Sequence, residues 1–171
     1  VKCINDDEYI TSSTLDYYYQ IKYGKVEKIN SNVQNGFDMD VTHNKIIATL
    51  NGLAKLGTDN NIKKINSDIN DLIPYRINYN ENYGYFVGTY ANSIYLLNEQ
   101  FEVIHSFENQ VSNFIMDVFI DKNQIIWVAS DGDGIFSINP TQFTNFKIEE
   151  DKHNNMVWAL KADKNSKNIT Y

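Results

Sequence analysis

The chain has 171 residues, enough for one domain with a sizeable core, and it carries a formal net charge of −7 at pH 7 with a pI of about 4.9. So acidic a chain repels phosphate backbones, and we expect no nucleic-acid partner. No run approaches the roughly 20 apolar residues of a membrane span, so we expect no membrane contact by this chain, and its single cysteine, Cys3, excludes an internal disulfide or a cysteine zinc site.

Short stretches rich in Ile, Val, Tyr and Phe, separated by turns of Asn, Asp and Gly, predict an all-β chain. In chain order, we expect strands over 8–13, 17–24 and 25–30, then over 37–42, 45–50, 53–57 and 61–66, then over 74–79, 85–90, 93–98 and 101–107, and finally over 114–120, 125–130, 135–139 and 143–148. Only 65–73 could form a turn of helix.

These strands belong to a block that recurs about every 40 residues. Three copies align, with offsets of 41 and 40 residues, through an Asp or Asn followed by a bulky apolar residue: Asp121 and Trp127, Asn80 and Phe86, and Asp40 and Ile46. Stacked four-stranded units of this length make a β-propeller. We therefore predict a single β-propeller region over 1–171, with about four blades of four antiparallel strands over approximately 1–30, 38–65, 73–107 and 114–148, and a partial unit over 156–171.

Both ends of the chain are expected to fall inside a unit. Residues 157–171 match 115–127, with Asp163 over Asp121, so the chain stops within a strand of a fifth unit. Either the termini complete one blade between them and close a small ring, or the chain is a fragment of a larger propeller. Because four or five blades close only under strong curvature, we favour the fragment, whose terminal blades would expose apolar faces.

Residues 114–146 resemble the repeat of two-component-regulator propellers, which form the periplasmic sensor regions of hybrid two-component systems in Bacteroidetes. Ten residues occupy matching positions of that repeat: Asp121, Trp127, Val128, Ala129, Ser130, Gly132, Gly134, Ile135, Phe136 and Pro140. The preceding copy keeps Phe86, Val87, Gly88 and Thr89, whereas Phe86 and Ile46 replace the usual Trp. The resemblance implies a propeller fold. In that family two such propellers precede a β-domain, a membrane helix, a histidine kinase and a regulator, none of which is visible in this sequence.

Two conspicuous features favour structural roles. Trp127 lies in an apolar strand, and its replacement by Phe86 and Ile46 in other copies favours blade-to-blade packing over sugar stacking. Asp131 and Asp133 resemble half of a calcium loop, but the other acidic positions of such a loop are missing, so a hairpin turn is favoured.

Nothing in the sequence indicates catalysis. We expect Cys3 to be a small buried strand residue. His43, His105 and His153 lie in different units without the spacing of metal ligands, so we expect solvated or capping roles. A phosphate loop, a nucleophile elbow and a zinc-protease motif are all missing from the sequence. We therefore expect no catalytic residue, no metal and no cofactor, and a chain that is not itself an enzyme.

A candidate ligand site follows from geometry, because equivalent loops of every blade emerge on the same rim. The loops between second and third strands cover 12–16, 50–52, 89–93 and 130–134, and they present these polar residues: Asp16, Asn51, Tyr90, Asn92, Asp131 and Asp133. Carboxylates, carboxamides and a Tyr suit a polyhydroxylated ligand. The alternative is that Asn and Asp only serve the turns.

The hypothesis that unites these features is a non-enzymatic periplasmic sensor propeller. It would belong to a membrane-anchored hybrid two-component system, respond to an oligosaccharide from glycan breakdown, and pass the signal to a tethered histidine kinase. A homodimer, or contact with another propeller region of the same parent chain, would then be the protein partner. The alternatives are a structural or protein-binding propeller, and a propeller lyase or hydrolase acting on polysaccharide.

Overall fold

The structure is a computed structural model that describes residues 1–12, 17–107, 114–138, 143–146, 161–162 and 169–170. The first half of the chain forms eight strands: β1 (Lys2–Asn5), β2 (Glu8–Ser12), β3 (Tyr18–Lys22), β4 (Lys25–Ser31), β5 (Gly36–Asp40), β6 (Ile46–Thr49), β7 (Gly52–Leu56) and β8 (Asn61–Lys64). A short 3-10 helix, η1 (Asn70–Leu72), follows β8 within the stretch expected to make a turn of helix.

The remaining strands continue the same order. They are β9 (Pro74–Asn80), β10 (Gly84–Thr89), β11 (Ile94–Leu97) and β12 (Val103–Phe107), then β13 (Ile115–Ile120), β14 (Ile126–Ser130), β15 (Gly134–Ile138) and β16 (Phe143–Phe146), and finally the short pair β17 (Lys161–Ala162) and β18 (Ile169–Thr170). The prediction of an all-β chain is confirmed for the described residues. No helix among them is long and apolar enough to cross a membrane.

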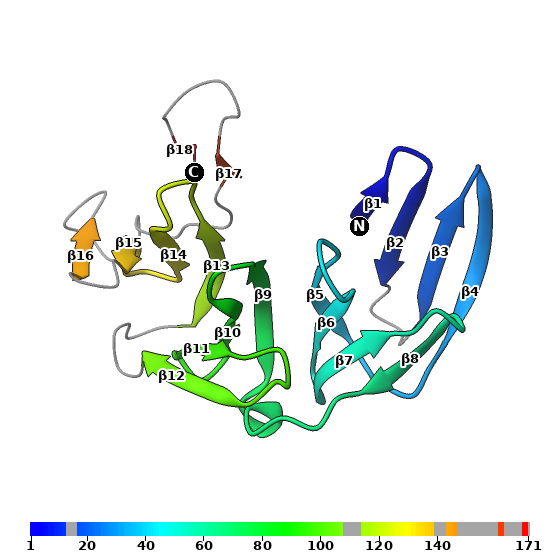
Figure 1. Ribbon diagram of the computed structural model, residues 1–171, viewed down its shortest axis with the longest axis horizontal. Coiled ribbons are helices and arrows are strands. Elements are labelled where there is room, and N and C mark those ends of the chain that lie inside the picture. Colours follow the sequence, from blue (N-terminus) through cyan, green and yellow to red (C-terminus); the bar gives the residue numbers. More distant parts are fainter. Residues whose placement is uncertain (13–16, 108–113, 139–142, 147–160, 163–168, 171) are drawn as a thin grey trace.

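Consecutive strands pair into antiparallel meanders of four. β9–β12 and β13–β16 each form a four-stranded sheet, whereas β1–β4 and β5–β8 are joined into one eight-stranded sheet by parallel pairing of β4 with β8. Viewed as in Figure 1, the meanders are arranged around a common centre, with β4, β8, β12 and β16 at the periphery. The fold is propeller-like, and the number of blades in a complete ring stays a prediction.

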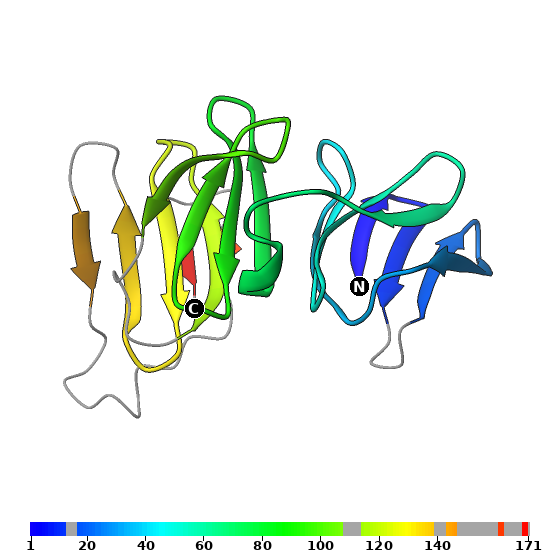
Figure 2. The same ribbon diagram turned by 90° about the horizontal axis from the view of Figure 1, so that it is seen from below.

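The strands run between two ends of the molecule, where their connecting turns gather (Figure 2). One end carries the turns between second and third strands, such as residues 50–52, and the connections that lead into β5, β9 and β13. We call it the rim end. The opposite end carries the turns between first and second strands and between third and fourth strands, such as residues 41–45 and 98–102.

The apolar core lies between neighbouring meanders. Ile46 of β6 shares one buried cluster with Tyr85 of β10, and Phe86 of β10 shares another with Val128 of β14. The strands β6 and β10 are buried almost throughout, as expected of strands covered on both faces. Phe86 and Ile46 therefore pack between meanders. Trp127 is half-buried and packs on a separate cluster with Met116 and Ala129.

The repeated Asp or Asn that defined the sequence repeat closes a turn after each first strand. The Oδ1 atom of Asp40 accepts a hydrogen bond from the backbone N–H of Thr42 (3.0 Å), that of Asn80 from Asn82 (2.9 Å), and that of Asp121 from Asn123 (2.8 Å). This is the Asx-turn geometry for which Asp and Asn are favoured. The repeat motif therefore specifies a backbone turn, and this explains its recurrence without any ligand.

Two carboxylates of β5 also join neighbouring meanders. Asp38 accepts a hydrogen bond through Oδ2 from the backbone N–H of Ile77 (3.1 Å), and Asp40 accepts one through Oδ2 from the backbone N–H of Tyr79 (2.9 Å). Both donors lie on β9, the edge strand of its sheet. Side chains of one meander thus satisfy backbone donors of the next where no strand pairs with them.

Two expectations from the sequence differ from the structure. Cys3 is exposed, so the prediction of a buried cysteine was wrong. It lies on β1, which pairs only with β2 and forms the edge of its sheet, so one side of the strand has no neighbouring strand to cover it. The second difference is the strand β1 itself, which the sequence analysis did not predict. It precedes the three strands expected at the start of the chain and completes a meander of four there. Pro140, expected to end a strand, lies outside the described residues.

Candidate functional site

Two of the residues expected at the rim accept hydrogen bonds, and a third adopts a turn conformation. Asn51 accepts a hydrogen bond through Oδ1 from the backbone N–H of Gln34 (3.1 Å), and Asp133 accepts one through Oδ2 from the hydroxyl of Ser130 (3.2 Å). Asn92 adopts the left-handed conformation of a turn residue, with φ of 62°. Asp16 lies outside the described residues. Asn51, Asn92 and Asp133 thus have roles within their own turns or connecting segments.

Tyr90 and Asp131, in contrast, meet at one residue that the sequence did not single out, Phe114. The ring of Tyr90 stacks on that of Phe114, with centroids 5.0 Å apart and planes 15° apart. The backbone N–H of Asp131 donates a hydrogen bond to the carbonyl oxygen of Phe114 (3.1 Å). Two of the five rim residues that the structure describes therefore converge on the residue that precedes β13.

Tyr90 belongs to a cluster of four rings that we call the aromatic patch: Phe37, Tyr75, Tyr90 and Phe114. The centroid of Tyr75 lies 4.9 Å from that of Phe37, 6.1 Å from that of Tyr90 and 5.7 Å from that of Phe114. Tyr90 is 53% exposed and Phe37 is 36% exposed. The patch therefore presents two accessible rings, each next to that of Tyr75, and it draws on three meanders at the rim end.

Below the aromatic patch lie two ion pairs between first strands. Lys2 of β1 pairs with Asp38 of β5, with 2.8 Å between Nζ and Oδ1. Arg76 of β9 approaches Asp117 of β13, with 4.0 Å between Nε and Oδ1. In the sheets, Asp38 lies opposite Ala48, Arg76 opposite Gly88 and Asp117 opposite Ala129, and these partners are equivalent positions of the repeat. Equivalent positions of the first strands thus carry charges that alternate in sign from one meander to the next.

Arg76, the only arginine of the chain, has further contacts. Its guanidinium carbon lies 4.3 Å from the centroid of the Tyr75 ring, a cation–π arrangement, and its Nη1 donates to the carbonyl oxygen of Tyr75 (3.1 Å). The aromatic patch and the ion pairs are therefore directly connected. A small cavity of about 60 Å³ beside them is lined by Lys2, Phe37 and Asp38 among others. It is far smaller than the roughly 300 Å³ of a small ligand pocket, so a sugar chain would have to bind on the open surface.

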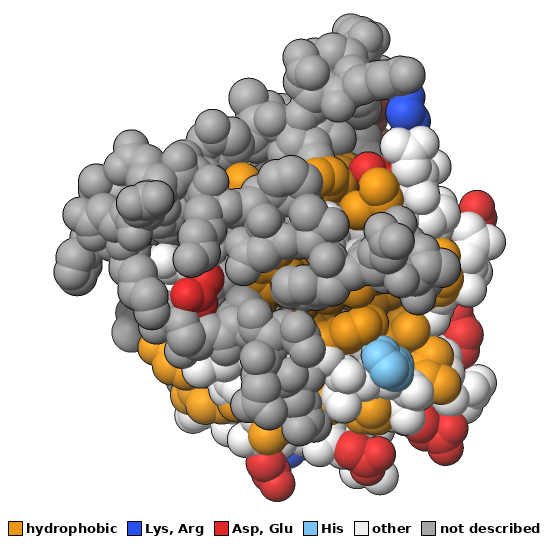
Figure 3. All heavy atoms as spheres, turned by 90° about the vertical axis from the view of Figure 1, so that its left-hand side faces the viewer, with side chains coloured by type: hydrophobic (Ala, Val, Ile, Leu, Met, Phe, Trp, Pro, Cys, Tyr) orange, Lys and Arg blue, Asp and Glu red, His pale blue; other side chains and the backbone are white. Residues whose placement is uncertain are grey.

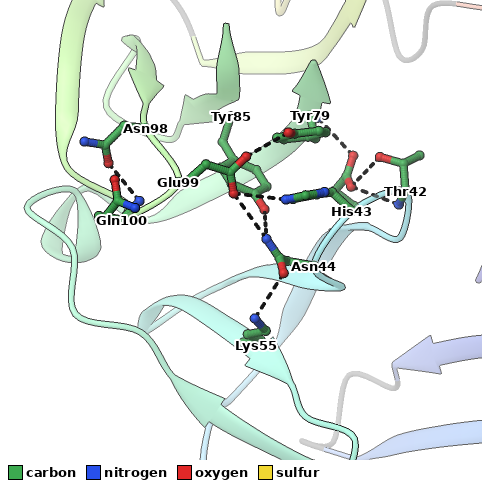
Figure 4. A network of polar contacts seen from close by, with 10 residues as sticks. Thr42, His43, Asn44, Lys55, Tyr79, Tyr85, Asn98, Glu99 and Gln100 are labelled. Atoms are coloured by element: carbon green, nitrogen blue, oxygen red, sulfur yellow. Dashed lines mark hydrogen bonds and ion pairs between the residues drawn. The ribbon is translucent and has the colours of Figure 1, made fainter. Parts of the chain in front are cut away.

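A second polar cluster lies at the opposite end, between the meanders β5–β8 and β9–β12 (Figure 4). The ring of His43 stacks on that of Tyr79, with centroids 4.2 Å apart and planes 5° apart, and its Nε2 lies 3.0 Å from Oε2 of Glu99. Tyr79 donates its hydroxyl hydrogen to Oε1 of Glu99 (2.7 Å). Asn44 donates to the hydroxyl of Tyr85 (2.8 Å). Since both carboxylate oxygens of Glu99 are engaged, this network is a closed contact between meanders.

The same contacts shift three pKa values. The hydrogen bond from Tyr79, with those from His43, holds the pKa of Glu99 below its ordinary value, and the same bond to Glu99 raises the pKa of Tyr79. Burial raises the pKa of Tyr85 to about 12, although the hydrogen bond from Asn44 acts against it. Glu99 is therefore an anion and both tyrosines are neutral at pH 7.

Sequence reasoning missed most of both clusters. Phe37, Tyr75 and Phe114 each stand next to or within the start of a first strand, and this shared place in three copies was the signal that could have predicted the aromatic patch. His43 and Glu99 are 56 residues apart, and their spacing carries no signal. Among the described residues, no group of His, Cys, Asp and Glu is arranged to hold a metal ion.

Comparisons with known proteins identify similar folds. No protein-family model matches the sequence, and no curated protein matches it. The structure is similar to the extracellular domain of a protein from B. thetaiotaomicron, assigned in one structure to a one component system (TM-score 0.74) and in another to a hybrid two component system (TM-score 0.75). In both comparisons the identity is 15%, and the match covers 96% of this chain and 24% of that domain.

A second group of similar structures is enzymatic. Virginiamycin B lyase from Staphylococcus aureus matches with a TM-score of 0.63 and 16% identity over 85% of this chain and 57% of the lyase. A catalytically inactive variant of that lyase with quinupristin gives a TM-score of 0.61 and 15% identity. The chain thus spans about a quarter of the extracellular domain and over half of the lyase. At these identities the likeness establishes the fold alone.

Proposed function

We propose that this chain is a non-enzymatic sensor module of a hybrid two-component system, located in the periplasm as part of a membrane-anchored parent. The observation that carries the proposal is the similarity of almost the whole chain to part of an extracellular domain assigned to such a system. The resemblance of residues 114–146 to the propeller repeat of these sensors points the same way. The ligand would be an oligosaccharide from glycan breakdown, and the readout would be a tethered histidine kinase.

The aromatic patch supports a ligand surface at the rim end. Exposed aromatic rings attract the C–H groups of a pyranose, because the face of the ring is the negative side of its quadrupole. Tyr90 and Phe37 offer such faces, and Asp131, whose backbone N–H binds the carbonyl oxygen of Phe114, carries a carboxylate that can accept sugar hydroxyls. A sugar-binding role would explain why these rings are exposed to solvent, because packing between meanders does not require exposed rings.

Signalling would follow from a shift of population. The aromatic patch joins residues of three meanders, so a ligand that bridges them favours one mutual arrangement of the meanders over another. A ligand can shift this equilibrium only by its difference in affinity for the two arrangements. In the parent, that difference would be transmitted to the kinase.

The test is calorimetric titration of the chain with a panel of oligosaccharides, repeated with Tyr90→Ala. We expect Tyr90→Ala to weaken binding about two- to tenfold, since a stacked aromatic ring contributes roughly 0.5–1.5 kcal/mol. Tyr23→Ala is the matched control, because Tyr23 is 73% exposed in the turn before β4, at the opposite end. The proposal fails if no sugar binds, or if both variants bind as well as the original chain.

Protein binding is the alternative function. Phe37, Leu50 and Tyr90 are exposed apolar side chains gathered at the rim end, as at protein interfaces. This alternative predicts self-association that Tyr90→Ala reduces and sugars leave unchanged. Sedimentation velocity at increasing protein concentration, with and without oligosaccharide, separates the two functions.

A further inference from the structure

The cations nearest the aromatic patch are neutralised by the protein itself. Lys2 lies 2.8 Å from Asp38, and Arg76 lies 4.0 Å from Asp117. Arg76 is also held over the ring of Tyr75 and donates to its carbonyl oxygen. An acidic ligand would need a guanidinium or ammonium group to pair with its carboxylate, and here both groups already have carboxylate partners.

The described turns between second and third strands add only negative charge to these pairs. Asp131 and Asp133 follow β14, and the described rim turns at 50–52 and 89–93 contain no Lys or Arg. Counting the two ion pairs and these two carboxylates gives two cations and four anions, a net charge of −2. The chain as a whole carries −7, and acidic side chains are spread along the margins of the face seen in Figure 3. A polyanion would meet repulsion both at long range and on contact.

We propose that the rim site selects uncharged sugar chains and rejects acidic ones, and that Asp117 contributes to this selectivity by neutralising the charge of Arg76. The inference rests on the proposed function and concerns the class of its ligand. The exposed rings of Tyr90 and Phe37 each lie next to that of Tyr75, so the surface suits an oligosaccharide that contacts both rings rather than a single sugar. Stacking is the attraction in this geometry, and stacking needs no charge on the ligand.

Asp117 is a specificity-determining residue because its removal leaves the guanidinium of Arg76 without this carboxylate as a counter-ion. The side chain of Arg76 is 19% exposed, so part of it is open to solvent. In Asp117→Asn the guanidinium loses its counter-ion and becomes a partner for a ligand carboxylate, with which a planar fork can form two parallel hydrogen bonds. The same change leaves the four rings of the aromatic patch in place, so binding of neutral sugars is kept.

The experiment compares sugars that differ only in charge. The probes are linear hexaoses of glucose, mannose and galactose, and the three hexauronates with the same linkages, titrated calorimetrically into the chain at low and at physiological salt. We expect at least one neutral hexaose to bind about tenfold or more tightly than its uronate, with a smaller ratio at higher salt because the repulsion is screened.

Two variants then test the role of Asp117. Asp117→Asn should raise the affinity for the uronate about tenfold and leave that for the neutral hexaose within about twofold, a separation that simple misfolding would not give. Asp59→Asn is the control of equal charge change, since Asp59 lies in the turn before β8 at the opposite end, and it should alter neither affinity.

The outcomes distinguish this inference from the function on which it rests. A uronate that binds the original chain as tightly as its neutral counterpart overturns the selectivity and leaves a glycan sensor standing. Unchanged uronate affinity in Asp117→Asn removes Asp117 from the explanation. Failure of all six probes to bind rejects glycan binding by this chain, and the selectivity with it.

Discussion

Replacing Gly88 by Ala should destabilise the chain although Ala is found at the same place in two other copies of the repeat. Gly88 on β10 corresponds to Ala48 and Ala129, both fully buried. A Cβ atom at Gly88 would lie 2.6 Å from Cγ2 of Ile115, closer than real Cβ contacts come, and 3.0 Å from its Cβ. Two other copies of the repeat accept a methyl group at this position, but at Gly88 the neighbouring strand β13 leaves no space for one.

The expected cost follows from two opposing effects. Overpacking a core position costs about 1–3 kcal/mol, and replacing Gly by Ala restricts the unfolded chain, which returns roughly 0.4–1 kcal/mol. The net loss of unfolding free energy should be about 1–2 kcal/mol, read from the midpoint of urea unfolding followed by tryptophan fluorescence. Equal or greater stability of the variant would refute the steric reasoning.

A double-mutant cycle tests whether Ile115 is the cause. Ile115→Leu removes the Cγ2 branch, so Gly88→Ala should cost less in that background, with a coupling of about 1 kcal/mol. Gly24→Ala is the matched control, because a Cβ there meets nothing within 4 Å and its φ of +72° makes the cost conformational. It should show no coupling to Ile115→Leu. Additivity of Gly88→Ala with Ile115→Leu within about 0.5 kcal/mol would exclude the clash.

Three further changes test contacts between and within meanders. Asn70→Ala removes the acceptor of the Leu53 backbone N–H (2.9 Å) and the donor to the carbonyl oxygen of Ile65 (2.8 Å), so it should lower the unfolding free energy by about 1–3 kcal/mol. Asn70→Asp keeps the acceptor but turns a carboxylate oxygen toward that carbonyl, so it should also lower the urea midpoint. The pKa of Tyr85 is raised to about 12, so the contribution of this tyrosine to stability is present below pH 10.0 and is lost as the pH rises through about 12. Tyr85→Phe should reduce this loss of stability at alkaline pH, as measured by unfolding midpoints across that range. The pKa of Glu99 is lowered from 4.5, so the contribution of this carboxylate to stability is present above pH 4.5 and is lost as the pH falls through the folded-state pKa. Glu99→Gln should make the unfolding midpoint depend less on pH in the acid range, and an unchanged pH dependence would contradict this.

The sequence predicted most of the strands because their burial is periodic and their turns are chemically distinctive. The predicted strand over 125–130 is β14, and the predicted turn at DGDG has Gly132 and Gly134 at positive φ. The strand β1 was missed because KCIN has no alternation of apolar and polar residues, and an edge strand needs none. Alternation reports which residues a sheet buries, so it does not detect strands with little to bury.

The candidate site was less predictable. Equal offsets in a repeat locate turns at one end, and Tyr90 and the backbone of Asp131 both contact Phe114 there. Contacts between different meanders depend on how the sheets are rotated and spaced, which no single copy encodes. For that reason the stacking of Tyr90 on Phe114, and the pairing of His43 with Glu99, emerged only from the structure.

The two carboxylates of β5 that bind backbone donors of β9 also bear on aggregation. A strand at the edge of a sheet is a template on which another chain can add a strand, because its unpaired N–H groups point outward. Asp38 and Asp40 occupy two of these donors, at Ile77 and Tyr79, and they place negative charge along the same edge. An invading strand would have to displace both carboxylates and accept their repulsion. The inner edge of this meander is thereby closed to strand addition by its neighbour's side chains rather than by another strand.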